Sequence, residues 1–293
     1  MRTQLLGSGL IAQSQSSLPP FVLHRPASLP EAMETALRKP NALIVAGCSD
    51  LVAQFREGLV PDEVVSLQRV PELTEISHEN GVLSIGSMVT HHRGSTSPVV
   101  REVSLALAEA WKSIATVRIR FKATIGGNLM SRRHRYEMPI ILSAVDAEMH
   151  FCGESGDRRL PVSALWDAEK TPSGLLTKVT VETDSLDWFG YDRSMRPLTT
   201  VALSIRSEGP AGLRITATCG SEYRKTFIMS HVQEVAGVWE LDARSVASTL
   251  VGQLPEEAAD YSGTIDYRRH LVGVLCRRLL QSAIATANER TTL

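Results

Sequence analysis

The stretch that most constrains the fold is Ala123-Thr124-Ile125-Gly126-Gly127-Asn128-Leu129. A β-branched pair runs into two glycines and an asparagine, and this composition predicts a sharp turn rather than a continuing helix or strand. Residues without a Cβ let another molecule approach the backbone N–H groups closely, which is the chemistry of a diphosphate-binding turn. Because Gly-Gly alone is more often only a tight turn, the motif by itself leaves both interpretations open.

A second turn of small residues lies upstream. The segment Ala46-Gly47-Cys48-Ser49-Asp50 follows the apolar run Leu43 to Val45, and we expect a helix from about Leu51 to Gly58 directly behind it. A strand that leads through small residues into a helix N-terminus favours the binding of phosphate, because the first N–H groups of a helix have no internal partner. Two such turns in one chain predict a dinucleotide that is held from two sides.

Charge and length narrow the classes of function. The chain has 293 residues, with 31 basic and 32 acidic side chains and a formal net charge of -1. A nucleic-acid or membrane-surface binder needs a basic excess, so we predict neither kind of partner. The sequence contains no apolar run of the ~20 residues that span a bilayer. We interpret residues 1–19 as a flexible extension rather than a signal peptide.

The cysteines and histidines show no metal-binding pattern. The four cysteines lie far apart and form no Cys-x-x-Cys or Cys/His cluster, so we predict no metal in this chain and assign any iron–sulfur centre to a partner. Scattered cysteines are typical of reduced thiols, which predicts a cytoplasmic location. Neighbouring side chains of a strand point to opposite faces, so we interpret His91 and His92 as solvated residues rather than shared ligands.

The remaining pattern predicts alternating helices and strands. An Asn-Gly pair predicts a hairpin turn at Glu79-Asn80-Gly81, and Ser28 is the expected N-cap of a helix. Apolar spacing predicts one helix over 99–114. It also predicts an amphipathic helix over 266–287 whose polar side carries Arg268, Arg269, Arg277 and Arg278.

In this order the motifs resemble those of the FAD-binding subunits of molybdenum hydroxylases. That family includes the medium chain of carbon monoxide dehydrogenase and the flavin domain of xanthine dehydrogenase. The resemblance covers roughly residues 20–287. The matching pieces are Leu43 to Leu51, Val70 to Leu73, Leu83 to Thr90, Ile119 to Asn128 and Tyr267 to Arg278.

The resemblance implies an α+β fold. It consists of a two-subdomain FAD-binding fold (PCMH-type), followed by a smaller α+β C-terminal domain with a long final helix. We therefore expect an FAD-binding domain over 20–185, with subdomains of about 20–75 and 76–185. The composition turns acidic and turn-like around Thr183 to Gly190, and the C-terminal flavoprotein-type domain is expected over 186–293.

The resemblance also implies FAD as the cofactor, held through the backbone N–H groups of both glycine turns. It assigns Glu137 to the hydroxyl-bearing chain of the flavin, Leu176 to the neighbourhood of the flavin ring, and Arg193 to a place where the family often has lysine. FAD is favoured over FMN because two turns are more than one phosphate needs. No catalytic acid or base is assigned. The expected cofactor-binding residues are Val45, Ala46, Gly47, Cys48, Ser49, Asp50, Thr90, Thr124, Ile125, Gly126, Gly127, Asn128, Glu137, Leu176 and Arg193.

Two segments depart from the family pattern. Cys48 replaces the second glycine of the first turn, and its Cβ narrows the approach to a phosphate unless φ stays negative. The segment Met130 to Tyr136 is strongly basic where the family is small and often acidic. Its arginines are interpreted as ligand contacts, as a docking face or as a solvated loop.

Three functions remain open at this point. The first is an FAD-binding oxidoreductase subunit that assembles with iron–sulfur and molybdopterin subunits into an oligomer and passes their electrons to an external acceptor. The second is a stand-alone pathway enzyme on the same scaffold, either a flavin oxidase or a flavin-free cyclase. The third is a scaffold subunit that contributes only an interface. Cys48 and the basic segment motivate the second function.

Overall fold

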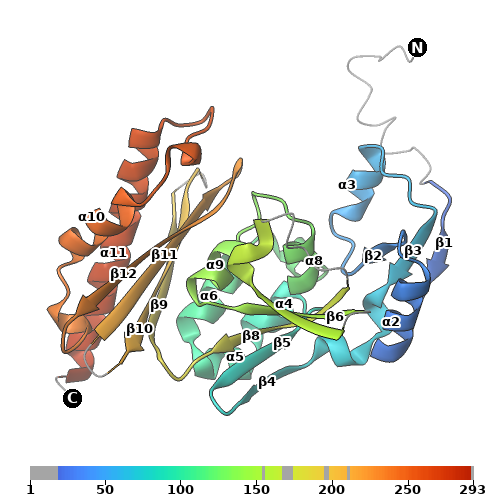
Figure 1. Ribbon diagram of the computed structural model, residues 1–293, viewed down its shortest axis with the longest axis horizontal. Coiled ribbons are helices and arrows are strands. Elements are labelled where there is room, and N and C mark those ends of the chain that lie inside the picture. Colours follow the sequence, from blue (N-terminus) through green and yellow to red (C-terminus); the bar gives the residue numbers. More distant parts are fainter. Residues whose placement is uncertain (1–18, 154–155, 167–173, 195–197, 210–211, 292–293) are drawn as a thin grey trace.

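The computed structural model describes residues 19–153, 156–166, 174–194, 198–209 and 212–291 (Figure 1). The predicted extension at 1–19 lies outside the described residues except for residue 19. The described strands form three sheets of three, five and four strands, which follow one another along the chain. The domain limits drawn from the sequence stay a prediction.

The first sheet is small and parallel, in the order β1-β3-β2. Its flanking helix α2 begins after Ser28, whose Oγ accepts a hydrogen bond from the Glu31 N–H at 3.3 Å, so the predicted N-cap is confirmed. The elements are β1 (Val22–His24), α2 (Leu29–Arg38), β2 (Leu43–Val45), α3 (Leu51–Arg56) and β3 (Glu63–Ser66).

The second sheet is antiparallel, in the order β4-β5-β8-β6-β7. The turn between its first two strands has positive φ at Asn80 (49°) and Gly81 (73°), as a type I′ hairpin requires, so the predicted hairpin is confirmed. The strands are β4 (Ile76–Glu79), β5 (Val82–Gly86), β6 (Glu148–Gly153), β7 (Gly156–Pro161) and β8 (Leu175–Glu182).

Short helices pack on the second sheet, and two predictions fail among them. The single helix expected over 99–114 is interrupted at Ser104, whose φ of -158° is extended and whose hydroxyl caps the next helix. His91 and His92 lie in a helix rather than a strand. The helices are α4 (His91–Thr96), α5 (Pro98–Val103), α6 (Leu105–Ser113), α7 (Val117–Arg120), α8 (Ile125–Met130) and α9 (Met138–Ala144).

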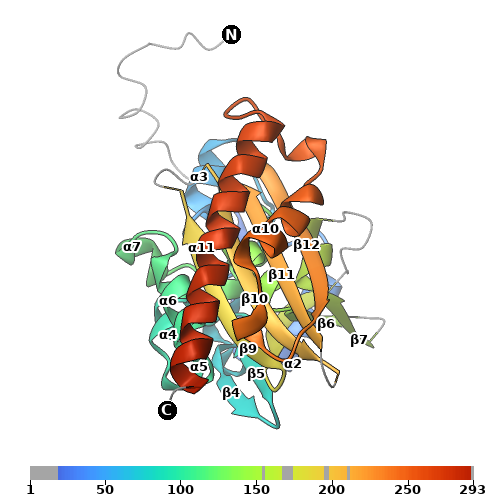
Figure 2. The ribbon, with the colours of Figure 1, turned by 90° about the vertical axis from the view of Figure 1, so that its left-hand side faces the viewer.

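The third sheet is an antiparallel meander, in the order β12-β11-β10-β9. Helices α10 and α11 cover its outer face, and α9 packs against the other face (Figure 1, Figure 2). Its strand β10 is buried on both sides because Leu203 faces the helices α10 and α11 while Ala202 joins the core of the second sheet. The elements are β9 (Leu186–Arg193), β10 (Thr200–Glu208), β11 (Gly212–Ser221), β12 (Arg224–Glu234), α10 (Ala243–Gly252) and α11 (Ile265–Thr291).

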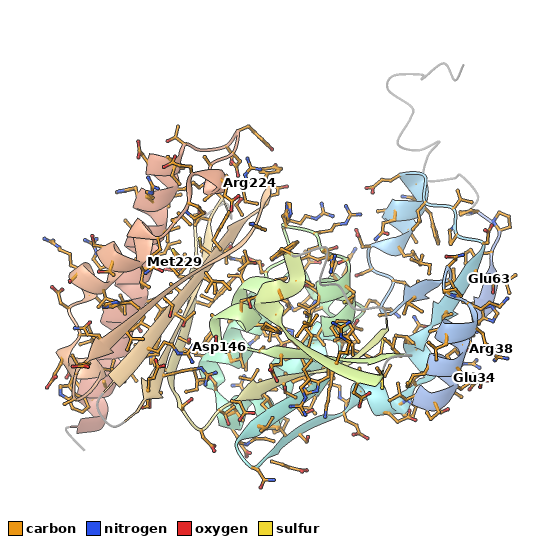
Figure 3. The ribbon with its side chains drawn as sticks, in the orientation of Figure 1. Glu34, Arg38, Glu63, Asp146, Arg224 and Met229 are labelled. Atoms are coloured by element: carbon orange, nitrogen blue, oxygen red, sulfur yellow. The ribbon has the colours of Figure 1, made fainter. Side chains whose placement is uncertain are left out.

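Short 3₁₀ helices complete the described chain: η1 (Leu67–Arg69), η2 (Pro71–Thr74), η3 (Val162–Trp166), η5 (Val238–Glu240) and η6 (Glu256–Ala258). Ion pairs join the segment between α9 and β6 to the third sheet at Asp146, which Figure 3 labels. Asp146, which follows α9, lies 2.9 Å from Arg214 Nη1 and 3.4 Å from Arg206 Nε. The guanidinium of Arg206 also donates to the carbonyl of Val145 at 2.7 Å. These contacts hold the α9–β6 connection against β10 and β11.

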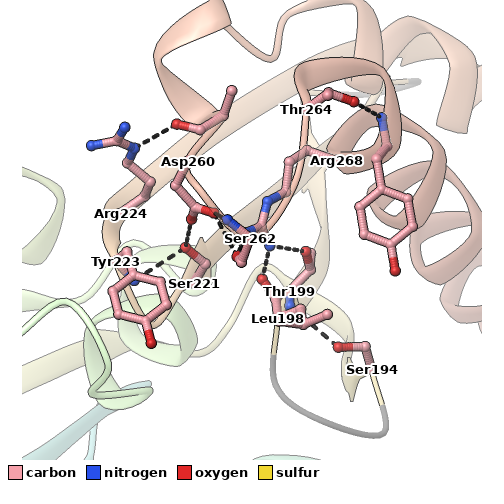
Figure 4. A network of polar contacts seen from close by, with 12 residues as sticks. Ser194, Leu198, Thr199, Ser221, Tyr223, Arg224, Asp260, Ser262, Thr264 and Arg268 are labelled. Carbon is pink, nitrogen blue, oxygen red and sulfur yellow. Dashed lines mark hydrogen bonds and ion pairs between the residues drawn. The ribbon is translucent and has the colours of Figure 1, made fainter.

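One arginine of the last helix is not on the polar side where the sequence pattern put it. Arg268 is 3% exposed, and its Nη2 lies 2.7 Å from Asp260 Oδ1 (Figure 4). Its Nη1 donates to the carbonyl of Leu198 and to Thr199 Oγ1. The pair is buried because it joins α11 to the start of β10. The pattern could not indicate this, since the partners come from the loops that flank these elements.

Candidate functional site

A cavity of about 660 Å³ lies between the first and second sheets and reaches Arg193 on β9. Cofactor sites usually fall between ~300 and 1,000 Å³. Of the predicted cofactor-binding residues, all but Thr90 and Ile125 line this cavity: Val45, Ala46, Gly47, Cys48, Ser49, Asp50, Thr124, Gly126, Gly127, Asn128, Glu137, Leu176 and Arg193.

Thr90 and Ile125 lie behind the lining. The Thr90 side chain accepts from the Arg93 N–H at 3.2 Å and so caps α4, and the residue forms a bridge with Thr124. Ile125 is fully buried in the core of the second sheet, and its N–H donates to the Val89 carbonyl. Both residues position the glycine segment rather than face the cavity.

The first glycine turn offers unpaired backbone donors. Within the described part of the chain, the N–H groups of Gly47, Cys48 and Ser49 donate to no protein acceptor. A Cβ on Gly47 would overlap the carbonyl oxygen of Lys122, so the backbone fits there only as glycine. Gly47 and Cys48 are half-buried and Ser49 is exposed, and three consecutive donors at a cavity wall suit an anion.

Cys48 adopts a backbone conformation that normally belongs to glycine. The sequence predicts that the Cβ of Cys48 narrows the approach to a phosphate unless φ is negative. The observed φ is positive, 57°, so the Cβ narrows that approach. The thiol is half-buried, and its Sγ donates to the Ala46 carbonyl at 3.3 Å. Burial raises the pKa of the Cys48 thiol, so it stays un-ionised and adds no negative charge beside the donors.

The second glycine segment is the start of helix α8, not the sharp turn expected from its composition. Thr124 caps the helix by accepting from the Gly127 N–H at 3.1 Å, and the Gly126 N–H donates to the Ser87 carbonyl. A Cβ on Gly126 would lie 2.8 Å from that same carbonyl oxygen, so this glycine permits close packing on Ser87, the residue that follows β5. Gly127 faces the cavity, where a Cβ would lie 3.5 Å from Ala46 Cβ. The two glycine segments are therefore adjacent.

The basic segment after α8 neutralises an acidic group at the cavity. Asp50 lines the cavity, and its Oδ2 accepts from Arg133 Nε at 2.7 Å. Arg133 Nη2 also lies 3.4 Å from Glu57, and Arg135 lies 3.6 Å from Asp50 while lining the cavity itself. The loop after α8 is thus tied to α3 across the cavity. A contact between this segment and a ligand stays a prediction.

Glu137 joins the cavity to the third sheet. Its Oε1 accepts from the Tyr191 hydroxyl at 2.6 Å, from Arg193 at 3.3 Å and from Thr200 at 3.4 Å. Burial, together with the neighbouring Glu137 carboxylate, raises the pKa of Tyr191 above its usual range, so the phenol remains a donor. The cluster fixes Arg193 at the cavity wall with its side chain 41% exposed.

Sequence reasoning missed two polar residues of the cavity wall. His91, expected to be solvated, is 1% exposed, and burial together with the charge of Arg120 lowers its pKa to about 4. Ser87 belongs to a motif that matched the family, yet nothing in the pattern indicated a role for it. Its Oγ and the Oδ1 of Asn128 are buried at the cavity wall, and neither has a partner in the described part of the chain. Buried polar atoms without a partner at a cavity wall are available to hydrogen-bond a ligand.

The described residues hold neither a metal-binding cluster nor a bilayer-spanning helix. No group of three or more His, Cys, Asp or Glu side chains is arranged to hold a metal ion. Within the same ranges, no helix is both long enough and apolar enough to cross a bilayer.

Residues 19–181 match a family described as the FAD binding domain in molybdopterin dehydrogenase, and this match spans more than half of the 293 residues. The chain therefore belongs to that family. The glyceraldehyde dehydrogenase medium chain of Sulfolobus acidocaldarius is 26% identical over 274 residues, which cover 88% of this chain and 96% of that one. Caffeine dehydrogenase subunit beta of Pseudomonas sp. (strain CBB1) is 34% identical over 128 residues, or 43% of each chain.

Solved structures agree with the sequence relatives. The crystal structure of quinoline 2-oxidoreductase from Pseudomonas putida 86 contains a chain that superposes with a TM-score of 0.77 and 27% identity, covering 93% of this chain and 99% of that chain. A chain of carbon monoxide dehydrogenase from Hydrogenophaga pseudoflava gives a TM-score of 0.77 at 22% identity, which shows the shared fold.

These comparisons decide between the functions that the sequence left open. The resemblance to FAD-binding subunits of molybdenum hydroxylases and the α+β PCMH-type fold class are confirmed. The protein is an FAD-binding subunit of the oxidoreductase class, and this function is supported over a stand-alone pathway enzyme, whether a flavin oxidase or a flavin-free cyclase. The cavity fits that cofactor because three unpaired N–H groups and the unpartnered polar atoms of Ser87 and Asn128 meet there.

Proposed function

We propose that the cavity between the first two sheets holds FAD and that this chain is the flavin subunit of a molybdenum-containing dehydrogenase. The observation that carries the proposal is the row of unpaired N–H groups at Gly47, Cys48 and Ser49, directly beside Gly127. These donors suit the diphosphate, and the adjacent Asp50 repels it little because Arg133 and Arg135 lie against its carboxylate.

The other wall residues take the remaining parts of the cofactor. Glu137, held by Tyr191 and Arg193, is the proposed acceptor for the hydroxyl-bearing chain. Leu176, 4% exposed, is proposed to pack near the flavin ring. Bound FAD supplies the redox chemistry, while this chain positions it and excludes water. We assign no catalytic acid or base to the chain.

Partners supply the electrons. We propose that a molybdopterin subunit oxidises the substrate and that an iron–sulfur subunit carries the electrons to this chain, which delivers them to an external acceptor. The relatives that match over nearly the whole chain are medium chains of dehydrogenases. The cysteines Cys48, Cys152, Cys219 and Cys276 form no disulfide, which supports assembly of this oligomer in the cytoplasm.

The substitution Gly127→Asp tests the assignment of the cavity. Its carboxylate would enter the cavity beside Ala46 and compete with a diphosphate for the same N–H donors. We expect the flavin-stripped variant to bind FAD at least about ten-fold more weakly than the native chain, measured by quenching of flavin fluorescence.

The matched control is Gly252→Asp. Gly252 lies at the exposed end of α10, where a Cβ meets nothing within 4 Å. This variant adds the same charge far from the cavity and is expected to bind FAD as the native chain does. Native affinity in a folded Gly127→Asp variant would show that the cavity is not the FAD site.

A further inference from the structure

The wall of the cavity contains a buried chain of hydrogen bonds that runs from Trp111 through His91 to Asn128. Trp111 Nε1 lies 2.8 Å from His91 Nδ1. On the other side of the imidazole, the Asn128 amide lies 3.4 Å from His91 Nε2. Trp111 and His91 are each 1% exposed, and Asn128 is 8% exposed. Because these groups are largely shielded from water, their donors and acceptors must match one another.

The indole fixes the tautomer of the imidazole. An indole N–H can only donate, so His91 Nδ1 must accept and carries no proton. With its pKa lowered to about 4, His91 is neutral at physiological pH and holds its single proton on Nε2. The Trp111 ring has little freedom to leave this arrangement, since a Cβ on Gly94 would already overlap it.

The tautomer in turn fixes the amide. His91 Nε2–H is a donor, so the Asn128 atom that faces it must be the acceptor Oδ1 and not the amide nitrogen. The oxygen and nitrogen of an asparagine amide are assigned from their hydrogen-bond partners. With Oδ1 against His91, the amide nitrogen takes the buried position at the cavity wall that has no partner in the described part of the chain.

We propose that Trp111 and His91 are positioning residues that turn the Asn128 amide so that its NH₂ group, rather than its oxygen, faces the cofactor. The proposal rests on the function proposed above and adds how the protein orients the Asn128 amide so that its N–H donors face the cavity. The amide offers N–H donors to an acceptor-rich part of FAD. The opposite orientation would place an oxygen against the same acceptors and repel them.

We call the hydrogen-bonded series Trp111–His91–Asn128 the relay. Two measurements on the whole chain test it. Long-range ¹H–¹⁵N correlation spectra of ¹⁵N-histidine protein report which ring nitrogen carries the proton, and the His91→Gln variant identifies the signals of His91. We expect the Nε2–H tautomer in the flavin-stripped native protein. In Trp111→Phe the donor is lost, so we expect the tautomer to shift towards Nδ1–H and FAD affinity to fall about ten-fold.

The matched control is Trp166→Phe. Trp166 Nε1 is also buried, but it has no hydrogen-bond partner in the described ranges and does not line the cavity. We expect its removal to change neither the His91 tautomer nor FAD affinity. If Trp111→Phe does not fold, the isosteric Asn128→Asp variant replaces it, because it keeps an acceptor towards His91 and removes the donors from the cavity. We expect this variant to lose FAD affinity at least ten-fold.

The outcomes separate the relay from the proposed function. An Nδ1–H tautomer in the native protein would overturn the relay, as would unchanged FAD affinity in Trp111→Phe or, where it is used, in Asn128→Asp. In both cases FAD binding by the native chain and by Trp166→Phe would leave the proposed function standing. Failure of the native chain to bind FAD would instead contradict the proposed function.

Discussion

Cys48 carries backbone strain at the site. Left-handed φ costs a residue with a Cβ about 1–2 kcal/mol relative to glycine, and Cys48 has a φ of 57°. Its Sγ–Ala46 hydrogen bond and its half-buried thiol offset part of that cost. The residue thus keeps the turn in the shape that leaves the N–H groups of Gly47 and Ser49 unpaired.

Substitution of Cys48 should follow backbone preference. We expect Cys48→Gly to change the free energy of unfolding by less than about 1 kcal/mol, because relief of strain is offset by the larger entropy of the unfolded chain. Cys48→Val should lower it by more than about 1 kcal/mol, since β-branched residues avoid this region. Urea denaturation of both variants measures the difference. Equal stabilities would show that φ at this position is not constrained.

His91 gives the stability of the protein a pH dependence. Burial lowers its pKa to about 4 in the folded protein, against about 6.5 in an unfolded chain. Between these values the unfolded state binds more protons, so stability is fully present above pH 6.5 and is lost as the pH falls towards 4. At about 1.4 kcal/mol per pKa unit, the loss reaches about 3 kcal/mol.

The variant His91→Gln isolates this contribution because glutamine does not titrate. We expect the native protein to lose more free energy of unfolding than the variant when urea denaturation is repeated at pH 7 and pH 4.5. A difference between the two proteins that stays constant with pH would mean that His91 is not buried in its neutral form.

At the scale of elements, the loop after α8 and helix α3 are joined by charge. Asp50 binds Arg133 Nε at 2.7 Å, and both side chains are mostly buried, with exposures of 18% and 29%. Removing the arginine would leave a carboxylate facing the cavity without its closest counter-charge. We therefore expect the pair to affect the net charge of the cavity wall more than the free energy of unfolding.

A double-mutant cycle separates these roles. We expect Arg133→Gln to weaken FAD binding by a few-fold to about ten-fold, and Asp50→Asn combined with Arg133→Gln to restore most of the affinity because the exposed charge is gone. The measurement is a titration of flavin-stripped protein with FAD. If the double variant binds as weakly as Arg133→Gln, the arginine contacts the cofactor directly.

Local rules account for the elements that the sequence predicted well. Asn80-Gly81 needs no distant partner to form its turn, and the Ser28 cap depends only on Glu31 three residues later. Helix α8 was missed because two glycines disfavour a helix locally, whereas the Thr124 cap and packing on Ser87 stabilise it there. Burial of His91 was missed for a different reason, since its partner Trp111 lies on another helix and no local pattern indicates that contact.

For the whole molecule, family motifs located the cavity better than single residues could be assigned to it. The matching segments around Gly47 and Gly127 come from different parts of the chain and meet in the fold. Partners such as Asp50 with Arg133, or Arg268 with Asp260, join distant segments by contacts that no local spacing encodes. The sequence thus predicted residues that line one cavity, and the three-dimensional contacts define how the wall of that cavity is charged and oriented.

The central claim is that this chain binds FAD in the cavity between the first and second sheets. The most direct test is the cofactor content of the purified full-length protein, from its visible absorption spectrum and from mass spectrometry of the molecule released on denaturation. We predict flavin absorption and FAD at one molecule per chain. A protein that is purified without flavin and cannot be reconstituted with FAD, or that releases FMN, would contradict the account.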